Sequence, residues 1–217
     1  MKVTRRRGRG LAVALATLTV LAWATAWAVA APAAAARIDA QRFHDRMRKL
    51  WEDHVTWTRM VIVSVAHDLP DLDAAVARLL RNQADIGDAI RPFYGDEAAD
   101  ALTALLEEHI TTAADVLTAA KAGDETALRD ARDRWYDNAR RIGRFFHRAD
   151  PEAWPREEMV SMMTEHLDLT LAEATARLSG DYVADVAAYD RVHRQALRMA
   201  DVLSDGIIAA FPDRFAA

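Results

Sequence analysis

The sequence contains no cysteine. Disulfide bonds, a lipid-modified cysteine, a CxxCH haem attachment site and a cysteine nucleophile are therefore excluded. Several short catalytic motifs are also missing from the chain: the P-loop, a GxGxxG after a strand, the GxSxG elbow and HExxH. The Glu-x-x-His pairs of di-iron helical bundles are absent too. If the protein is exported, its core alone must hold it together.

The first 36 residues contain no acidic residue. A basic start is followed by an apolar run over residues 11–31 and then by small residues. This layout is typical of a secretory signal peptide, and the apolar run is long enough to span a bilayer if it is not removed. We therefore expect residues 1–36 to be a signal peptide or an N-terminal membrane anchor, and residues 37–217 to form one exported, extracytoplasmic domain, either secreted or held at the cell envelope.

Charge argues against some partners. Residues 1–36 carry five positive and no negative charges, so removing them moves the formal net charge from -5 to -10. A chain this acidic is not expected to bind nucleic acid or an anionic membrane surface. A membrane contact is expected only through residues 11–31 if the signal is retained, and the sequence does not identify a protein partner.

One heptapeptide pattern occurs three times. Residues 50–56, 105–111 and 162–168 read LWEDHVT, LLEEHIT and MMTEHLD, each with an acid or an acid pair before a histidine. The last two copies continue in register as far as Gly123-Asp124 and Gly180-Asp181. A repeat of this length indicates one supersecondary unit used three times.

The repeat and the helical spacing of apolar residues predict an all-α fold without strands. We expect a six-helix bundle built from three repeated αα-hairpins, over about residues 38–91, 97–148 and 156–210. Gly123 and Gly180 fit the left-handed position that ends a helix, and Asp124 and Asp181 fit the N-cap that follows. An amphipathic hairpin cannot bury its own apolar stripe, so the hairpins must close on one another or stack in line.

The three repeated histidines are His54, His109 and His166. Each lies among apolar residues on the predicted inner face of the first helix of its hairpin. In a closed bundle the three imidazoles meet near the axis, where zinc, copper or iron could bind them. In a linear stack, equivalent positions lie about 8–10 Å apart, too far for one ion.

Polar residues on the second helices are candidates to orient the imidazoles or to bind a ligand. Aligning the hairpins at Asp71, Asp124 and Asp181 places three of them in register: Asp85, Asn138 and Gln195. The same alignment brings His193 level with Gln83 and Tyr136. Glu173, seven residues after His166, lies on the same face, and its expected partner is Arg177 four residues on.

Three interpretations of the histidines stay open. They can be structural and only bridge helices by hydrogen bonds, they can bind a divalent transition metal or a small ligand, or they can carry proton chemistry. No catalytic residue is predicted, and an enzyme is the less favoured class. The alternative to a binding protein is a purely structural or protein-interaction module of the cell envelope.

Several segments carry a resemblance to a known family: LWEDHVTWTR, RLLRNQADIGDAIRPFYGD, KAGD, RWYDNA and HLDLTLAEATARL. On these the chain resembles a family of bacterial, all-helical proteins of unassigned function, over about residues 50–211. Some members carry the label acetylglutamate kinase. An amino-acid kinase needs a sheet with glycine-rich phosphate loops, which this sequence lacks, so the resemblance implies a bacterial helical protein and no catalytic residue.

Overall fold

A computed structural model describes residues 37–216. The predicted signal or anchor segment and the membrane contact through residues 11–31 lie outside this range. Within it, no helix is both long enough and apolar enough to cross a bilayer.

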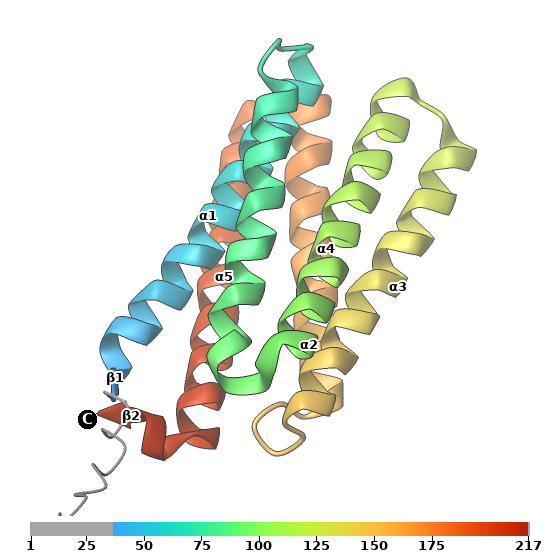
Figure 1. Cartoon of the computed structure of the whole chain (residues 1–217). Coiled ribbons are helices and arrows are strands. Elements are labelled where there is room, and N and C mark those ends of the chain that lie inside the picture. The colour runs from blue at the N-terminus through green and yellow to red at the C-terminus, as the bar shows by residue number, and fades with distance from the viewer. Residues whose placement is uncertain (1–36, 217) are drawn as a thin grey trace, which may run out of the picture. The chain divides into compact units, whose positions relative to one another are not determined.

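The described residues confirm an all-α fold, with five helices where six were predicted (Figure 1). The order is α1 (Ala40–His67), α2 (Leu72–Ala122), α3 (Glu125–Ala149), α4 (Arg156–Leu178) and α5 (Tyr182–Ala210). Each helix packs against the next in the chain, and α5 packs against α1. The helices therefore form a closed ring, and the linear stack is wrong.

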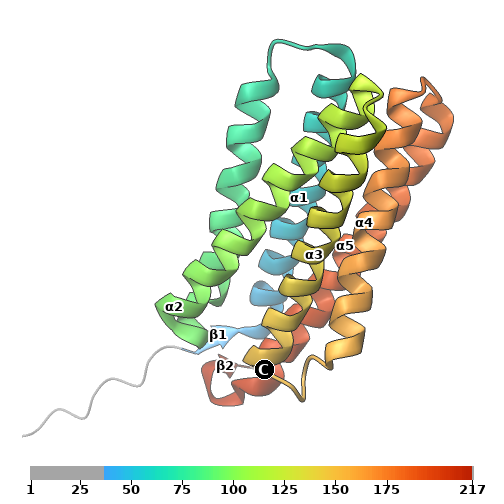
Figure 2. The ribbon, with the colours of Figure 1, turned by 90° about the vertical axis from the view of Figure 1, so that its right-hand side faces the viewer.

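The predicted second and third helices are both part of α2. The segment 92–96, expected as a loop, stays helical except at Gly95, whose φ of 83° and ψ of 177° reverse the chain. Residues with a Cβ rarely adopt this conformation, so glycine suits the bend. The two limbs of α2 then run side by side (Figures 1 and 2), with Gly87 so close to Ala99 and Thr103 that a Cβ would collide with them.

The predicted helix ends are confirmed at two connections. Gly123 has a φ of 69° and Gly180 a φ of 79°. The Asp124 carboxylate accepts from the backbone N–H groups of Thr126 and Ala127, and that of Asp181 accepts from Ala184. These bonds satisfy amides that the first helical turn leaves free. Asp71 does not cap α2; its carboxylate accepts from the Ser64 hydroxyl at 2.8 Å.

The prediction of no strand is wrong at the two ends of the domain. β1 (Ile38–Asp39) and β2 (Phe215–Ala216) pair in parallel, with Ile38 opposite Phe215. The Phe215 ring stacks on Phe93 with a centroid distance of 5.3 Å and an interplanar angle of 10°. This short ladder joins both ends of the described chain to the base of the bundle.

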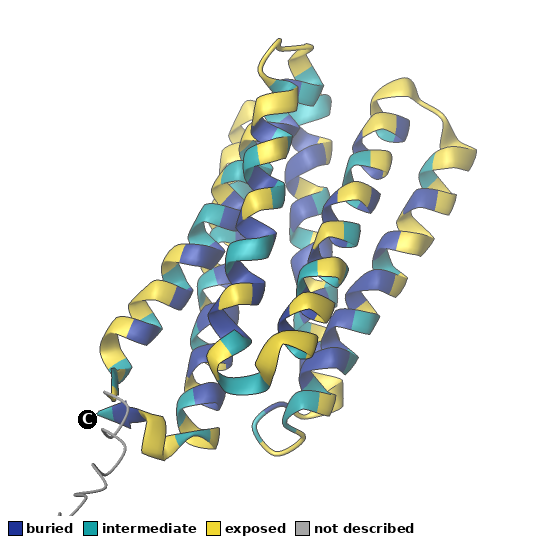
Figure 3. Ribbon diagram, viewed as in Figure 1, coloured by how far each residue is buried: buried dark blue, intermediate teal, exposed yellow. Residues whose placement is uncertain are grey.

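Each helix turns its buried residues toward its neighbours and leaves charged residues outside (Figure 3). The largest apolar cluster includes Trp51, Leu102, Ile142, Met163 and Leu203, contributed by all five helices. Burial at about 25 cal/mol per Å² of apolar surface is the main force that holds such a bundle together. Three histidines interrupt this otherwise apolar interior.

Candidate metal centre

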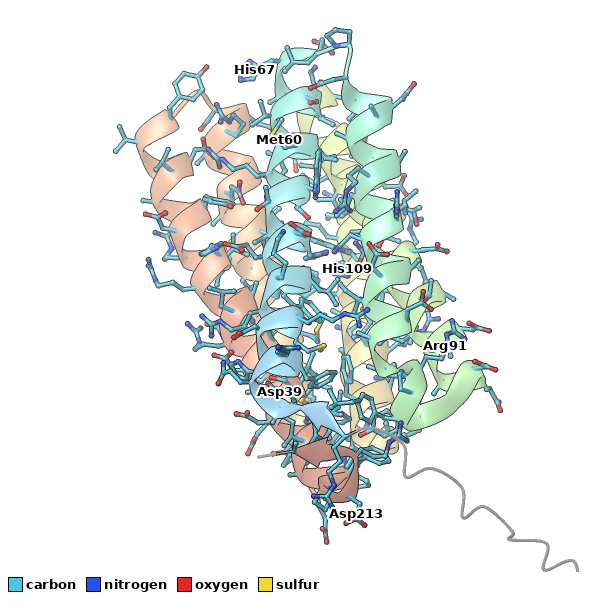
Figure 4. The ribbon with its side chains drawn as sticks, turned by 60° about the vertical axis from the view of Figure 1, so that its left-hand side comes forward. Asp39, Met60, His67, Arg91, His109 and Asp213 are labelled. Atoms are coloured by element: carbon cyan, nitrogen blue, oxygen red, sulfur yellow. The ribbon has the colours of Figure 1, made fainter. Side chains whose placement is uncertain are left out.

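The repeated histidines converge inside the ring of helices. His54 on α1, His109 on the second limb of α2 and His166 on α4 are only 2%, 3% and 2% exposed. Their ring centroids are separated by 5.6 to 6.3 Å, and one nitrogen of each ring lies within 4.8 Å of the other two. Figure 4 places His109 about midway along the bundle. The predicted convergence is therefore confirmed.

An amide side chain from the second helix holds each ring at Nδ1. His109 Nδ1 lies 3.0 Å from Asn138 Oδ1, and His166 Nδ1 lies 2.9 Å from Gln195 Oε1. Because an amide oxygen only accepts, both Nδ1 atoms must carry the proton and donate it. The other nitrogen of each ring, Nε2, is then left with its lone pair.

The two amides are themselves fixed. Asn138 Nδ2 donates to the Leu105 carbonyl at 2.9 Å, and Gln195 Nε2 donates to the Met162 carbonyl at 2.9 Å. Both carbonyls belong to the residue four positions before the histidine. Each amide therefore bonds to the ring and to the helix backbone below it, which prevents the amide from rotating.

The first ring is held differently. His54 Nδ1 lies 3.3 Å from Gln83 Nε2, which also donates to the Leu79 carbonyl at 2.8 Å. Gln83 Oε1 is buried without a partner. Because the facing group is a donor, His54 Nδ1 accepts, and its proton is on Nε2. Asn82 bonds to the Leu50 carbonyl at 3.0 Å, as Asn138 does to Leu105.

The structure places Asn138 and Gln195 at the rings and corrects the third residue of that set. Gln83, not Asp85, contacts His54. The connection between α1 and α2 is two residues longer than its counterparts, so an alignment at Asp71 is shifted by two. Counting from the histidine finds all three partners, because each lies 29 residues further along the chain.

His193 does not belong to the cluster. It is half-buried on α5, where its Nε2 lies 3.3 Å from a carboxylate oxygen of Glu52 and its ring lies 5.9 Å from that of Tyr189. The alignment at Asp181 places it two residues before Gln195, and two residues along a helix turn a side chain by about 200°. His193 therefore faces α1 near the surface.

Glu173 is buried as expected, but its partner is different. Arg59 on α1 donates to Glu173 Oε1 at 2.7 Å and also bonds to both carboxylate oxygens of Asp185 at 2.9 and 3.0 Å. Arg177, the expected partner, instead pairs with Asp185 at 3.0 Å. The residues Arg59, Glu173, Arg177 and Asp185, the buried ion network below, join α1, α4 and α5.

The acids that precede the histidines lie outside the cluster. Glu108 pairs with Arg141 at 2.6 Å and Glu165 pairs with Arg198 at 3.2 Å, each with an arginine 33 residues further on. Asp53 pairs with Lys49. These carboxylates are half-exposed, as adjacent positions on a helix diverge by about 100°. The histidine cluster itself therefore contains no charged ligand.

Burial keeps the imidazoles neutral. Desolvation lowers the pKa of His109 to about 3, and repulsion from His166 acts in the same direction. Desolvation also lowers the pKa of His54 well below its usual value, and that of His166. Neutral imidazole is the form that binds a metal ion. In contrast, burial raises the pKa of Glu173 to about 7, against the stabilising hydrogen bond from Arg59.

A cavity of about 30 Å³ adjoins the three rings. It is lined mostly by apolar side chains, among them Val61, Leu79, Ile110 and Trp135. A space of this size admits a water molecule or a ligand of a few atoms. Sequence reasoning had assigned Trp135 to packing alone and had not identified this cavity.

Gln83, Arg59 and Asp185 are the polar residues that the sequence analysis did not assign correctly. Gln83 carries a signal, namely its 29-residue separation from His54. Arg59 has none, since it lies 114 and 126 residues from its two partners and no repeat position matches it.

Comparison of the chain with models of protein families, with curated proteins and with solved structures finds no match. The resemblance to a bacterial helical family therefore stays a prediction.

Proposed function

We propose that His54, His109 and His166 bind one divalent transition metal ion, zinc or copper, through their Nε2 atoms. The observation that carries this proposal is the convergence of three buried ring nitrogens to within 4.8 Å of one another. Neutral imidazole is a good ligand for both metals. The donors come from three different helices, so a bound ion would also link α1, α2 and α4.

The distances are close to what a metal needs. With zinc–nitrogen bonds of about 2.0–2.1 Å, tetrahedral geometry separates two ligand nitrogens by about 3.3 Å. The observed limit of 4.8 Å exceeds this by at most about 1.5 Å. Small rotations of the rings about their side-chain bonds supply such a closure without moving the helices.

The amides of Asn138 and Gln195 support the same role. A histidine that ligates a metal through Nε2 commonly donates its Nδ1–H to a carbonyl or carboxylate oxygen, which sets the tautomer and the ring orientation. His109 and His166 have this arrangement already. His54 requires one adjustment: its proton must move from Nε2 to Nδ1, and the unpartnered Gln83 Oε1 must turn to accept it.

We also propose that the bundle consists of three αα-hairpins, with the two limbs of α2 belonging to the first and second of them. The repeated contacts support this assignment. Each histidine meets an amide 29 residues later, and in the last two copies the preceding acid meets an arginine 33 residues later. Three equivalent helices would then contribute one metal ligand each.

Titration calorimetry of the purified full chain with Zn²⁺ and Cu²⁺ at pH 7.5 tests the metal site. We expect one ion per chain, and at least a 100-fold loss of affinity in the variants His109→Leu and His166→Leu. His67→Gln serves as the matched control, because His67 is exposed at the end of α1, away from the cluster. Affinity should be unchanged in this variant.

A structural role for the histidines gives a different result. In that case neither ion would bind the wild-type chain, or the leucine variants would bind it as well as His67→Gln does. Either outcome would refute the metal site and favour a module that acts only as a scaffold.

A further inference from the structure

We propose that the metal at this centre keeps an open coordination position that takes a small monovalent anion, held in the cavity beside the histidines. This inference rests on the proposed metal site. Three observations carry it: the different size of the residue layers on either side of the rings, the neutrality of the donor set, and a buried N–H group that lacks a partner.

The layer before the histidines is filled by large side chains. Three residues earlier on each helix lie Trp51, Leu106 and Met163, each only 1% exposed. This layer belongs to the main apolar core and leaves no space for a ligand. A metal held by the three rings is therefore closed on this side.

The layer after the histidines is built from small side chains. Four residues later lie Thr58, Ala113 and Thr170, and all three line the cavity of about 30 Å³ that the rings also line. The same three residues line a second cavity of about 20 Å³ further along the bundle. The free space beside the rings thus lies on one side only, and that side receives the fourth ligand.

The charge of the donor set selects an anion. Three neutral imidazoles leave the full double positive charge of the metal in an apolar interior, which is costly. The carboxylates next to the histidines in sequence point outward and pair with basic side chains, so none of them compensates this charge. An anionic fourth ligand reduces the charge without a change in the protein.

Trp135 supplies a donor for such a ligand. It lines both cavities, its ring lies 5.5 Å from that of His109, and it is 3% exposed. Its Nε1–H is buried and has no hydrogen-bond partner among the described residues. A buried N–H normally has a partner, and an anion in the cavity would provide an acceptor. The hydroxyls of Thr58 and Thr170 donate to their own helices and leave lone pairs for a bound water.

The available space limits the anion to a few atoms. Hydroxide, cyanide and azide match cavities of about 30 and 20 Å³, and an aromatic carboxylate does not. Thr58 and Thr170 in addition restrict the width next to the rings. The class of ligand is therefore a small, rod-like or monatomic anion.

Azide titration of the cobalt-loaded full chain tests this inference. Co²⁺ replaces Zn²⁺ at histidine sites, and its visible absorption reports the coordination sphere. We first expect a cobalt band that requires His109, then a saturable change of the band with one azide per metal. Benzoate at the same concentrations should leave the band unchanged.

Two variants locate the anion. Ala113→Val fills part of the small layer and should weaken azide binding at least tenfold, while cobalt still binds. Trp135→Phe keeps the ring and removes the N–H, and it should weaken azide about fivefold or more at an unchanged cobalt affinity. If Ala113→Val does not fold, Trp135→Phe and the comparison of azide with benzoate still decide the question.

The outcomes separate the two proposals. Absence of a His109-dependent cobalt band would refute the metal site itself. A cobalt band that azide does not change, that benzoate changes equally, or that responds to azide equally in both variants would overturn the open position alone.

Discussion

The protein buries two groups of polar side chains, and they differ in how their bonding capacity is used. In the buried ion network, Glu173 and Asp185 are 1% and 0% exposed, and each carboxylate accepts from a guanidinium at 2.7 to 3.0 Å. In the histidine cluster, every ring is held at Nδ1, and no hydrogen bond within residues 37–216 reaches any Nε2.

This difference separates a structural role from a binding role. A buried ion pair whose partners satisfy each other has little capacity left for a ligand, and its loss is felt as instability. Three neutral rings fixed on one side, with nitrogens left toward a common centre, retain unused bonding capacity. The two regions should therefore respond in opposite ways to mutation: one through stability, the other through ligand affinity.

The largest effect is expected in the buried ion network. Arg59→Met should destabilise the protein by about 3–5 kcal/mol, because it leaves Glu173 without a cation and Asp185 with Arg177 only. Urea unfolding followed by circular dichroism measures this change. Arg91→Met is the matched control, since Arg91 also bonds to several carboxylates but does so at the surface.

The control should cost less than about 1 kcal/mol, as exposed ion pairs contribute little. If Arg59→Met cost no more than Arg91→Met, the network would not stabilise the fold, and the contrast between the two regions would fail.

The pH dependence of stability is the next largest effect. In metal-free protein the three histidines bind protons below pH 6.5 only when unfolded, because their pKa values are lowered by folding. Their contribution is complete above pH 6.5 and is lost as the pH falls. Glu173 acts oppositely, because its raised pKa favours the protonated folded form below about pH 7. Between pH 7 and 5 we expect a net loss of about 3 kcal/mol.

Urea unfolding in the presence of a chelator at pH 7, 6 and 5 measures this loss. His109→Leu should reduce it by about 2 kcal/mol, the share of one buried histidine. An unchanged pH dependence in this variant would show that His109 titrates alike in the folded and unfolded chain.

The amides that hold the rings should affect metal affinity and differ among themselves. Asn138→Leu should weaken Zn²⁺ binding about 10- to 100-fold, because it removes the acceptor that sets the tautomer of His109. Gln83→Leu should weaken it less than tenfold, since Gln83 favours the His54 tautomer that cannot bind. Competition with a chromophoric chelator gives both affinities; equal losses would contradict the proposed tautomers.

The smallest effect is expected outside the cluster. Arg198→Ala breaks the half-exposed pair with Glu165, the acid next to His166. It should cost less than about 1 kcal/mol and leave Zn²⁺ affinity unchanged. Calorimetry and urea unfolding check both points, and a tenfold loss of affinity would assign Glu165 a role at the metal.

The sequence predicts the all-α fold and the histidine cluster because both follow from local patterns. Apolar spacing marks the inner faces, and repetition places His54, His109 and His166 at equivalent points. The bend at Gly95 was read as a loop, because Pro92 and Gly95 are ordinary signs of a helix end. The chain there stays helical up to a single residue.

Contacts between distant segments were not predictable in the same way. Arg59 reaches two acids more than 100 residues away, and nothing near it in the chain indicates them. Glu173 has a good local partner in Arg177, but a carboxylate on α5 takes that arginine. Gln83 was missed for another reason: the first connection is longer, and the histidine was the better point for the alignment.

X-ray absorption spectroscopy of the zinc-loaded protein at pH 7.5 tests the central claim most directly. The account predicts three imidazole nitrogens at about 2.0–2.1 Å from each zinc, with one further light-atom ligand. A shell with one imidazole, or with oxygen ligands only, would contradict it.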